Sequence, residues 1–293
     1  MNGIVRRRAA RGFTLVEAVL VIVIIGIIGA IVAVFIRAPV QGYADSVARA
    51  AAGDEADLAL RRMAREIRLA LPNSVRVNTD GDTIEFLLTK TGGRYLAAED
   101  GATSGKPLDF VDGLKTEFTV VGGLQAQVEK GEYVVVYNLG PGMTPADAYR
   151  FKDADRNIAR VSEKAGAGAT EVKLEDNPFA RDEPMPSPGR RFQVVSTPVT
   201  YRCEGSGGKG ILTRYANYPI RATLDDKMDT PSAAVLARRV ADCAGLFRYD
   251  QADVELRRSA LVLLTLGLST RGAGDAGDGV VRLLHQLHVD NTP

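Results

Sequence analysis

The sequence predicts an α+β protein, in which a long N-terminal α-helix packs on a mainly antiparallel β-sheet head. Two observations lead to this fold class. Apolar and helix-forming residues dominate the chain as far as residue 71, and no proline interrupts 44–71. Beyond Pro72 the hydrophobic period shifts towards two, in short runs rich in Val, Tyr, Phe and Thr that Gly, Pro, Asn and Asp separate. A helix followed by strands is the order expected of such a fold.

The N-terminal segment has the length and polarity of a membrane anchor. Residues 1–12 contain four arginines and no acidic residue, and 13–36 is apolar except for Thr14 and Glu17. As a helix, 13–36 would be about 36 Å long, which is enough to cross a hydrocarbon core of about 30 Å. The arginines predict that 1–12 stays in the cytoplasm and that the chain after Arg37 is exported.

Three interpretations of this segment differ in what they make of Glu17. A secretory signal peptide would be cut after the apolar run, where Ala30–Ala33 offers small residues, but the run is longer than usual. A plain signal anchor explains the length and leaves Glu17 without a role, although a carboxylate in hydrocarbon costs about 2.5 to 3.5 kcal/mol. The third interpretation gives Glu17 a partner.

The residues Arg11-Gly12-Phe13-Thr14-Leu15-Val16-Glu17, followed by the apolar run, resemble the class III signal of type IV pilins and type II secretion pseudopilins. The resemblance implies that prepilin peptidase cuts between Gly12 and Phe13, and that Phe13 is then N-methylated. It also implies that the apolar segment 13–36 stays attached after cleavage and anchors the mature chain in the membrane. Glu17 would become its fifth residue and neutralise the terminal amine of a neighbouring subunit during assembly.

The predicted domains follow from this resemblance and from the helical pattern. They are a cytoplasmic leader peptide at 1–12, an N-terminal helix at 13–71 with its transmembrane part at 13–36, and an extracytoplasmic β-rich head at 72–293. We expect a kink or local melting at Pro39 and Gly42. The second half of the helix carries an apolar stripe that should dock on the head: Leu60, Met63, Ile67 and Leu71. We expect its arginines to form a solvated face; the alternative is contact with another subunit or with an anionic surface.

Within the head the pattern predicts nine strands and one short helix at Ala233–Ala241. The strands are Thr83–Thr89, Thr116–Val121, Glu132–Tyr137, Arg191–Val195, Val199–Cys203, Ile211–Tyr215, Leu246–Tyr249, Leu261–Leu268 and Val280–Val289. The segment Asp153–Arg191, rich in charge, Gly and Pro, reads as a long excursion from the sheet. Ser269–Gly279 reads as a flexible connection.

Candidate metal ligands in the sequence do not form a convincing site. Asp153, Asp155 and Asn157 have the first spacings of a calcium loop, but Ile158 and Lys164 stand where glycine and glutamate are needed. A second acidic group reads as a solvated turn: Asp225, Asp226 and Asp229. We therefore expect no metal and no cofactor.

Two pairs of residues in the head are informative. His285 and His288 are three apart in a predicted strand, so their side chains should point to opposite faces. Cys203 and Cys243 are the only cysteines, and in an oxidising exported compartment they would form a disulfide; the alternative is two buried thiols.

Charge and motifs argue against an enzyme or a nucleic-acid binder. The chain has 37 basic and 36 acidic residues, which leaves a net charge of +1 and no field that would attract nucleic acid. No serine or cysteine lies in a nucleophile motif, and no glycine loop matches a phosphate cradle. We expect no catalytic residue and no enzyme activity. An enzyme held by a signal anchor remains the alternative class.

A finer resemblance, to the MshO-type minor pilins of the mannose-sensitive haemagglutinin (MSHA) pilus system, rests on scattered stretches of the head. They include Leu283–Pro293, Arg191–Val195, Val199–Cys203, Pro141-Gly142 with Asp147–Tyr149, and Val235–Ala237 before Cys243.

The resemblance implies a structural subunit that helps initiate or cap a pilus. Its partners would be prepilin peptidase, other major and minor pilins, and the inner-membrane assembly platform. It would lie in the bacterial inner membrane with a periplasmic head, and later in the pilus. Alternatives are a minor pseudopilin of type II secretion, a tip adhesin or a DNA-uptake pilin.

Overall fold

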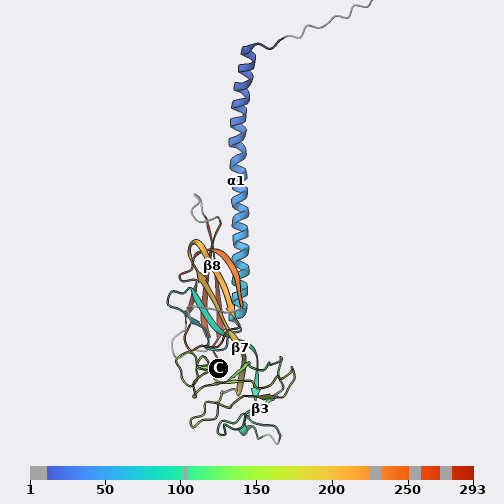
Figure 1. Ribbon diagram of the computed structural model, residues 1–293, viewed down its shortest axis with the longest axis vertical. Helices are drawn as coiled ribbons and strands as arrows, with labels where there is room; N and C mark the ends of the chain where they lie inside the picture. Colours follow the sequence, from blue (N-terminus) through green and yellow to red (C-terminus); the bar gives the residue numbers. More distant parts are fainter. Residues whose placement is uncertain (1–11, 102–103, 225–231, 251–258, 271–278) are drawn as a thin grey trace, which may run out of the picture. The chain divides into compact units, whose positions relative to one another are not determined.

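The computed structural model describes residues 12–101, 104–224, 232–250, 259–270 and 279–293. The chain divides into two compact units, residues 1–50 and 51–293. Helix α1, Leu15–Ile67, begins in the first unit and ends in the second (Figure 1). The expected melting near Pro39 and Gly42 is absent, because α1 is continuous through both residues. A single proline removes one backbone hydrogen bond, and the helical turns on both sides remain.

The helix ends at Ile67, before the predicted end at Leu71. The Ala70 amide donates to Ile67 O at 3.0 Å in a closing turn, and the Leu71 amide donates to Leu87 O at 2.7 Å. An isolated bridge joins Ala70 to Leu88. Backbone groups of a neighbouring strand thus satisfy the amides that a longer helix would have used, which ends α1 one turn early.

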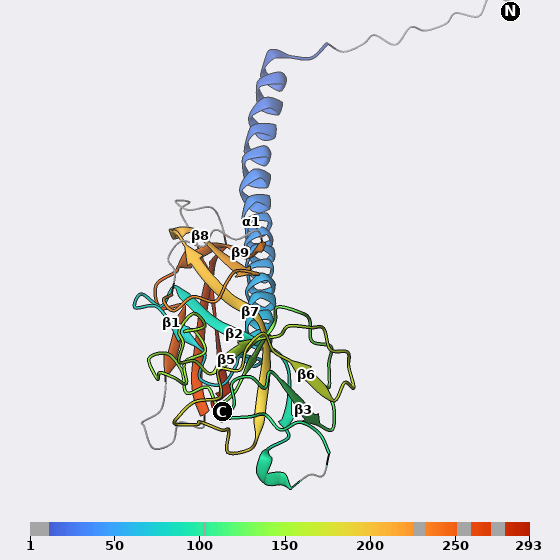
Figure 2. The same cartoon turned by 60° about the horizontal axis from the view of Figure 1, so that its bottom comes forward.

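The head confirms the α+β fold class, since the described strands form a mainly antiparallel sheet beside the last turns of α1 (Figure 2). The strands are β1 (Arg76–Val77), β2 (Thr83–Tyr95), β3 (Glu117–Val121), β4 (Tyr133–Val135), β5 (Ile158–Arg160), β6 (Glu171–Lys173), β7 (Arg191–Glu204), β8 (Ser206–Ala216), β9 (Ser232–Asp242), β10 (Phe247–Asp250), β11 (Ser259–Ser269) and β12 (Val280–Asp290). A short 3₁₀ helix, η1, covers Ala98–Asp100. The main path through the sheet is β10-β11-β9-β8-β7-β2-β3-β6, and β12 pairs with β11.

Two long strands, β2 and β7, connect two hydrophobic cores of the head. Phe86 and Tyr201 lie in the core that α1 covers, which we call the helix-side core. Tyr95 and Phe192, at the opposite ends of the same strands, lie in a second core. The strands β3 and β6 belong to this second core, and we call the part of the head around it the second lobe (Figure 2).

The helix-side core explains how α1 docks on the sheet. The helix buries four alanines among its contact residues, and these small side chains let its backbone approach the strands closely. The buried residues of α1 in this core are Ala52, Ala56, Ala59, Leu60, Met63, Ala64 and Ile67. The predicted stripe of Leu60, Met63 and Ile67 is therefore buried, while Leu71 packs in a third, smaller cluster.

The prediction of a short helix at Ala233–Ala241 is wrong, because these residues lie within strand β9. Its alanines, leucine and arginines have high helix propensity, but a helix of about ten residues is marginal without packing. In the head, β9 pairs with β8, with Leu212 opposite Ala237, and it buries Ala237 and Val240 in the helix-side core. Pairing with a neighbouring strand has overridden local propensity.

The segment Asp153–Arg191 is more structured than the predicted excursion. It contains β5, which pairs with β4, and β6, which pairs with β3, so it supplies part of the second lobe. The two predicted strands Arg191–Val195 and Val199–Cys203 are one strand, β7. The register against β2 shifts beside Pro198, where a proline cannot donate a ladder hydrogen bond.

A disulfide joins Cys203 of β7 to Cys243, just after β9, with Cα atoms 5.3 Å apart. Both residues lie in the helix-side core, and a Cβ added to Gly210 would come within 3.0 Å of Cys243 Sγ. The bridge closes a loop with a sequence separation of 40 residues. It therefore restrains the unfolded chain.

Replacing both cysteines by alanine is expected to lower the free energy of unfolding by about 2 to 4 kcal/mol. Urea titration of the full chain in detergent, followed by circular dichroism, measures this loss. Adding a reductant to the unmodified protein should produce a similar loss, while the double variant should not respond to it. Equal stability with and without reductant would contradict a stabilising role of the bridge.

Candidate assembly site at the start of the helix

The start of α1 places Thr14 and Glu17 one turn apart. Thr14 precedes the first helical residue, Leu15, and its Oγ1 accepts a hydrogen bond from the Glu17 amide at 3.3 Å. The Thr14 carbonyl accepts from the Ala18 amide at 3.2 Å. Thr14 thus caps the helix, since its side chain satisfies an amide that the first turn leaves free. Local sequence is enough to form this end.

Glu17 is an exposed acidic residue in the first turn of α1. The first turn carries the positive end of the helix dipole, which favours a carboxylate by about 0.3 to 1 kcal/mol near a water-exposed helix end. Glu17 forms no ion pair with any residue that the structure describes. Its charge is therefore available to a cation supplied from outside the described part of the chain.

Gly12 and Phe13 form the junction just before the helix. A Cβ built on Gly12 would meet nothing within 4 Å, and the Phe13 side chain is 75% exposed. No described side chain covers this peptide bond. The Gly12 Cβ position and the Phe13 side chain are therefore open to solvent.

The N-terminal part of α1 exposes a continuous apolar surface. Within the described residues, α1 is the one helix long and apolar enough to cross a membrane, and none of its most apolar stretch is buried. Large side chains such as Ile25 and Phe35 are 63% and 80% exposed. This length and composition suit a hydrocarbon environment, and the same segment carries Glu17 in its first turn.

Two glutamates join the last turns of α1 to the sheet by polar contacts. Glu66 Oε2 accepts from Tyr201 Oη at 2.7 Å and from Arg214 Nε at 2.8 Å. Glu55 Oε1 accepts from the Arg238 amide at 2.8 Å. Burial, followed by the bond to Glu66, raises the pKa of Tyr201, so its hydroxyl stays a donor. The spacing of eleven residues, three helical turns, places both glutamates on one face, which was a detectable sequence signal.

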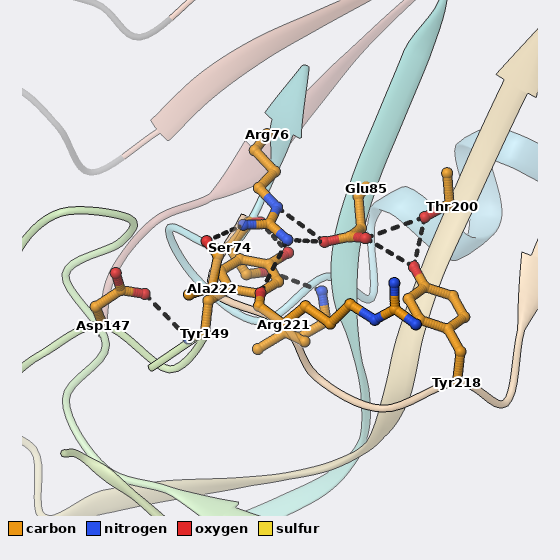
Figure 3. Close-up of polar contacts among 10 residues, drawn as sticks. Ser74, Arg76, Glu85, Asp147, Tyr149, Thr200, Tyr218, Arg221 and Ala222 are labelled. Atoms are coloured by element: carbon orange, nitrogen blue, oxygen red, sulfur yellow. Dashed lines mark hydrogen bonds and ion pairs between the residues drawn. The ribbon is translucent and has the colours of Figure 1, made fainter. Parts of the chain in front are cut away.

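A buried polar network in the head surrounds Glu85 of β2, whose side chain is 2% exposed (Figure 3). Arg76 of β1 donates from Nε to Glu85 Oε1 at 2.8 Å and makes a second, shorter bond to it from Nη2. The hydroxyls of Thr200 and Tyr218 donate to Glu85 Oε2 at 3.2 and 2.9 Å. Burial, followed by the charge of Glu85, raises the pKa of Tyr218. The carboxylate is thus fully surrounded by donors.

The other donors of Arg76 extend the network into the loops. Its Nη1 donates to Ala222 O at 2.8 Å, and its Nη2 donates to Arg221 O at 3.1 Å. The guanidinium carbon lies 3.7 Å from the centre of the Tyr149 ring, and Tyr149 Oη donates to Ser74 O at 2.8 Å (Figure 3). The network therefore joins strands to loops that are far apart in the sequence, which no local pattern in the sequence indicated.

The candidate calcium ligands have separate protein partners. Asp153 accepts from Arg150, and Asp155 Oδ1 lies 3.8 Å from Arg181 Nη1. The buried Asn157 side chain donates from Nδ2 to Tyr137 O at 3.3 Å, while its Oδ1 has no partner among the described residues. Among the described residues no group of three His, Cys, Asp or Glu side chains could hold a metal ion. Asp225, Asp226 and Asp229 lie outside the described residues.

The two histidines of β12 lie on opposite faces of the strand, as predicted. His288 is exposed, and His285 is partly buried. Their side chains therefore cannot share a ligand.

Comparison with known proteins identifies the N-terminal segment. Residues 7–33 match the family model of the prokaryotic N-terminal methylation motif, and this range includes the Gly12–Phe13 junction, Glu17 and the apolar start of α1. No curated protein and no solved structure gives a significant match to the chain.

The motif and the exposed apolar helix together indicate a type IV pilin-like or pseudopilin-like subunit. A class III signal of this kind implies processing by prepilin peptidase and assembly with other pilin-like subunits.

Proposed function

We propose that this chain is a minor pilin-like structural subunit that takes part in initiation or tip assembly of a type IV pilus of the MSHA kind. The observation that carries the proposal is Glu17, an acidic residue in the first turn of an exposed apolar helix within an N-terminal methylation motif. Cleavage between Gly12 and Phe13 creates an amine four residues before Glu17, about 6 Å along a helix axis.

Assembly would follow from the cost of burying these charges separately. A carboxylate in hydrocarbon is unfavourable by about 2.5 to 3.5 kcal/mol, and an ammonium group has a comparable cost. When helices of neighbouring subunits stack, the Glu17 carboxylate of one chain meets the Phe13 amine of another, and the apolar surfaces of both helices are covered. N-methylation keeps the positive charge of that amine. The chain itself performs no chemistry in this proposal.

A minor role, at the pilus tip, is supported by the size of the head. Residues 51–293 form one compact unit, and heads of this size would crowd one another if they were repeated along a dense shaft. The resemblance of Leu283–Pro293 and of the β7 segment to MshO-type subunits supports the same role. The head would face the periplasm before assembly and lie in the pilus afterwards. The assembly platform of the inner membrane and other pilins would be the partners.

The identity of the mature N-terminal residue tests the proposal. We expect intact mass and N-terminal sequencing of the protein purified from its bacterial host to show a chain that begins with N-methylated Phe13. Deletion of the prepilin peptidase gene should leave residues 1–12 attached. A mature chain that begins near residue 34 would instead identify a secretory signal peptide and exclude the proposal.

A minor pseudopilin of type II secretion is the second candidate, because the methylation motif occurs in both classes. Deleting the gene distinguishes the two. We expect the deletion to reduce the number of surface pili and to leave protein secretion unchanged. Loss of secretion with normal piliation would assign the chain to the secretion system.

A further inference from the structure

The second lobe contains a pocket of about 550 Å³ that the assembly role does not use. Three segments form it: the residues after β2 with η1, the loop 107–111 and the loop before β7. Its apolar lining comes mainly from two aromatic rings and four prolines: Tyr95, Phe110, Pro107, Pro184, Pro186 and Pro188. The Tyr95 and Phe110 ring centres are 5.8 Å apart. Rigid side chains therefore supply most of the apolar part of the walls.

One rim of the pocket is the loop 109–115, which we call the rim loop, and it presents apolar side chains to water. Val111 is 85% exposed and lines the pocket, and Leu114, three residues later, is 90% exposed. Covering exposed apolar side chains with a partner is favourable by about 25 cal/mol per Å² of apolar surface buried. A loop that keeps such side chains in fixed positions is suited to docking.

Hydrogen bonds hold this loop in one conformation. Asp109 Oδ1 accepts from the amides of Val111 and Asp112, each at 2.8 Å, and Oδ2 accepts from Lys115 Nζ at 2.8 Å. The Leu114 amide donates to Asp112 Oδ1 at 3.0 Å. The bond from Lys115, followed by the bonds from the Asp112 and Val111 amides, lowers the pKa of Asp109 to about 2. The loop is therefore ordered before any ligand binds, so a ligand need not order it.

The charges of the pocket leave an excess of carboxylates. Asp109 is matched by Lys115, and Asp100 pairs with both Arg190 and Arg94. Glu99 lines the pocket and is exposed, and it forms no ion pair within the described part of the head. The same holds for the two exposed acids directly before Pro184, which are Asp182 and Glu183. A cationic group in the occupant would complement these charges.

Most polar groups of the pocket already bond within the protein. Ser187 Oγ accepts from the Arg191 amide at 3.2 Å, and both oxygens of Asp109 are engaged. Burial raises the pKa of Tyr95 to about 12, so the phenol keeps its proton; among the described residues its oxygen has no hydrogen-bond partner, and solvent does not reach it. A polyhydroxylated ligand such as a sugar needs many free donors and acceptors. An occupant with an apolar side chain and one positive charge needs few.

We propose that this pocket and its rim loop bind a polypeptide segment of a partner protein, in which an apolar side chain stands next to a lysine or arginine. The apolar side chain enters between the rings and the prolines, while Val111 and Leu114 cover its flank. The basic side chain lies beside Glu99. Because the site uses no residue of α1, it can be occupied whether or not the N-terminal helix is assembled.

Binding of two labelled peptides to the full chain in detergent tests the proposal by fluorescence polarisation. The probes are the sequence Gly-Leu-Arg-Leu-Gly and its counterpart with glutamate in place of arginine. We expect the basic peptide to bind at least about tenfold more tightly, which corresponds to about 1.4 kcal/mol. Glu99→Gln should reduce this preference, and Glu99→Lys should invert it. Leu114→Ser should weaken both peptides.

Glu204→Lys is the matched control, because it makes the same charge change on an exposed glutamate at the end of β7. It should leave peptide affinity unchanged. Thermal unfolding of each variant verifies that the head remains folded. Three results would overturn the proposal: no binding of either peptide up to about 1 mM, equal binding of both, or a preference that Glu99→Lys does not alter.

Discussion

Replacing Glu17 by valine is expected to leave the protein in the membrane and to abolish its incorporation into pili. Valine makes the apolar run more hydrophobic, so insertion is retained. The amine of Phe13 in a neighbouring subunit then loses its partner in a low-dielectric site, which costs about 3 to 5 kcal/mol. A loss of this size corresponds to roughly a hundredfold to several-thousandfold weaker assembly. Immunoblots of membranes and of sheared pili measure both outcomes.

Thr14→Val separates this charge effect from helix capping. The variant removes the Oγ1 that accepts the Glu17 amide and keeps the carboxylate. Loss of a cap typically costs about 0.5 to 2 kcal/mol. We therefore expect Thr14→Val to assemble much better than Glu17→Val. Normal pilus incorporation of Glu17→Val would refute the charge-pairing account, and equal defects in the two variants would point to capping instead.

Breaking the buried pair of Arg76 and Glu85 should have the largest effect on the head. In Glu85→Gln, the Arg76 guanidinium keeps its charge, and its side chain is only 12% exposed. An uncompensated buried charge typically costs about 3 to 5 kcal/mol. The hydroxyls of Thr200 and Tyr218 also lose a charged acceptor. Urea titration of the full chain in detergent measures the loss. Far-ultraviolet circular dichroism is the signal, because the sequence has no tryptophan for fluorescence.

The double variant Arg76→Met with Glu85→Leu is the control for this pair. It removes both charges and keeps apolar volume, so it should recover part of the stability lost in Glu85→Gln. Thr200→Val removes one hydroxyl donor to the carboxylate and should cost only about 1 kcal/mol. A free energy of unfolding for Glu85→Gln within about 0.5 kcal/mol of the unmodified protein would show that the network contributes little.

Most strands of the head were predictable because alternating apolar residues define them locally. The segments at Thr83, Ile211 and Leu261 each begin or lie within an observed strand, since one face of each is buried. β9 was predicted as a helix because its alanines and arginines form helices readily, and only pairing with β8 made it a strand. The short strands β1, β5 and β6 have two or three residues each, too few for a period to be visible.

The candidate assembly site was predictable almost entirely, whereas the polar network of the head was not. Gly12, Phe13 and Glu17 lie within six consecutive residues, and the helix that follows needs only local hydrogen bonds. The Glu85 network instead joins residues 76, 85, 200 and 218, so its members meet only after the sheet has formed. Each of them alone resembles an ordinary polar residue of a strand or loop.

The amino-acid sequence by itself determined the N-terminal helix, its apolar length, the acidic residue in its first turn and the methylation motif, because these depend on neighbours one or two turns away. Tertiary structure alone decided that β9 is a strand, that β2 and β7 connect two cores, and that Phe110 and Pro186 line one pocket. The physical reason is that β-pairing and side-chain packing bring together residues that are far apart in the chain, at a cost in chain entropy that only the complete fold offsets.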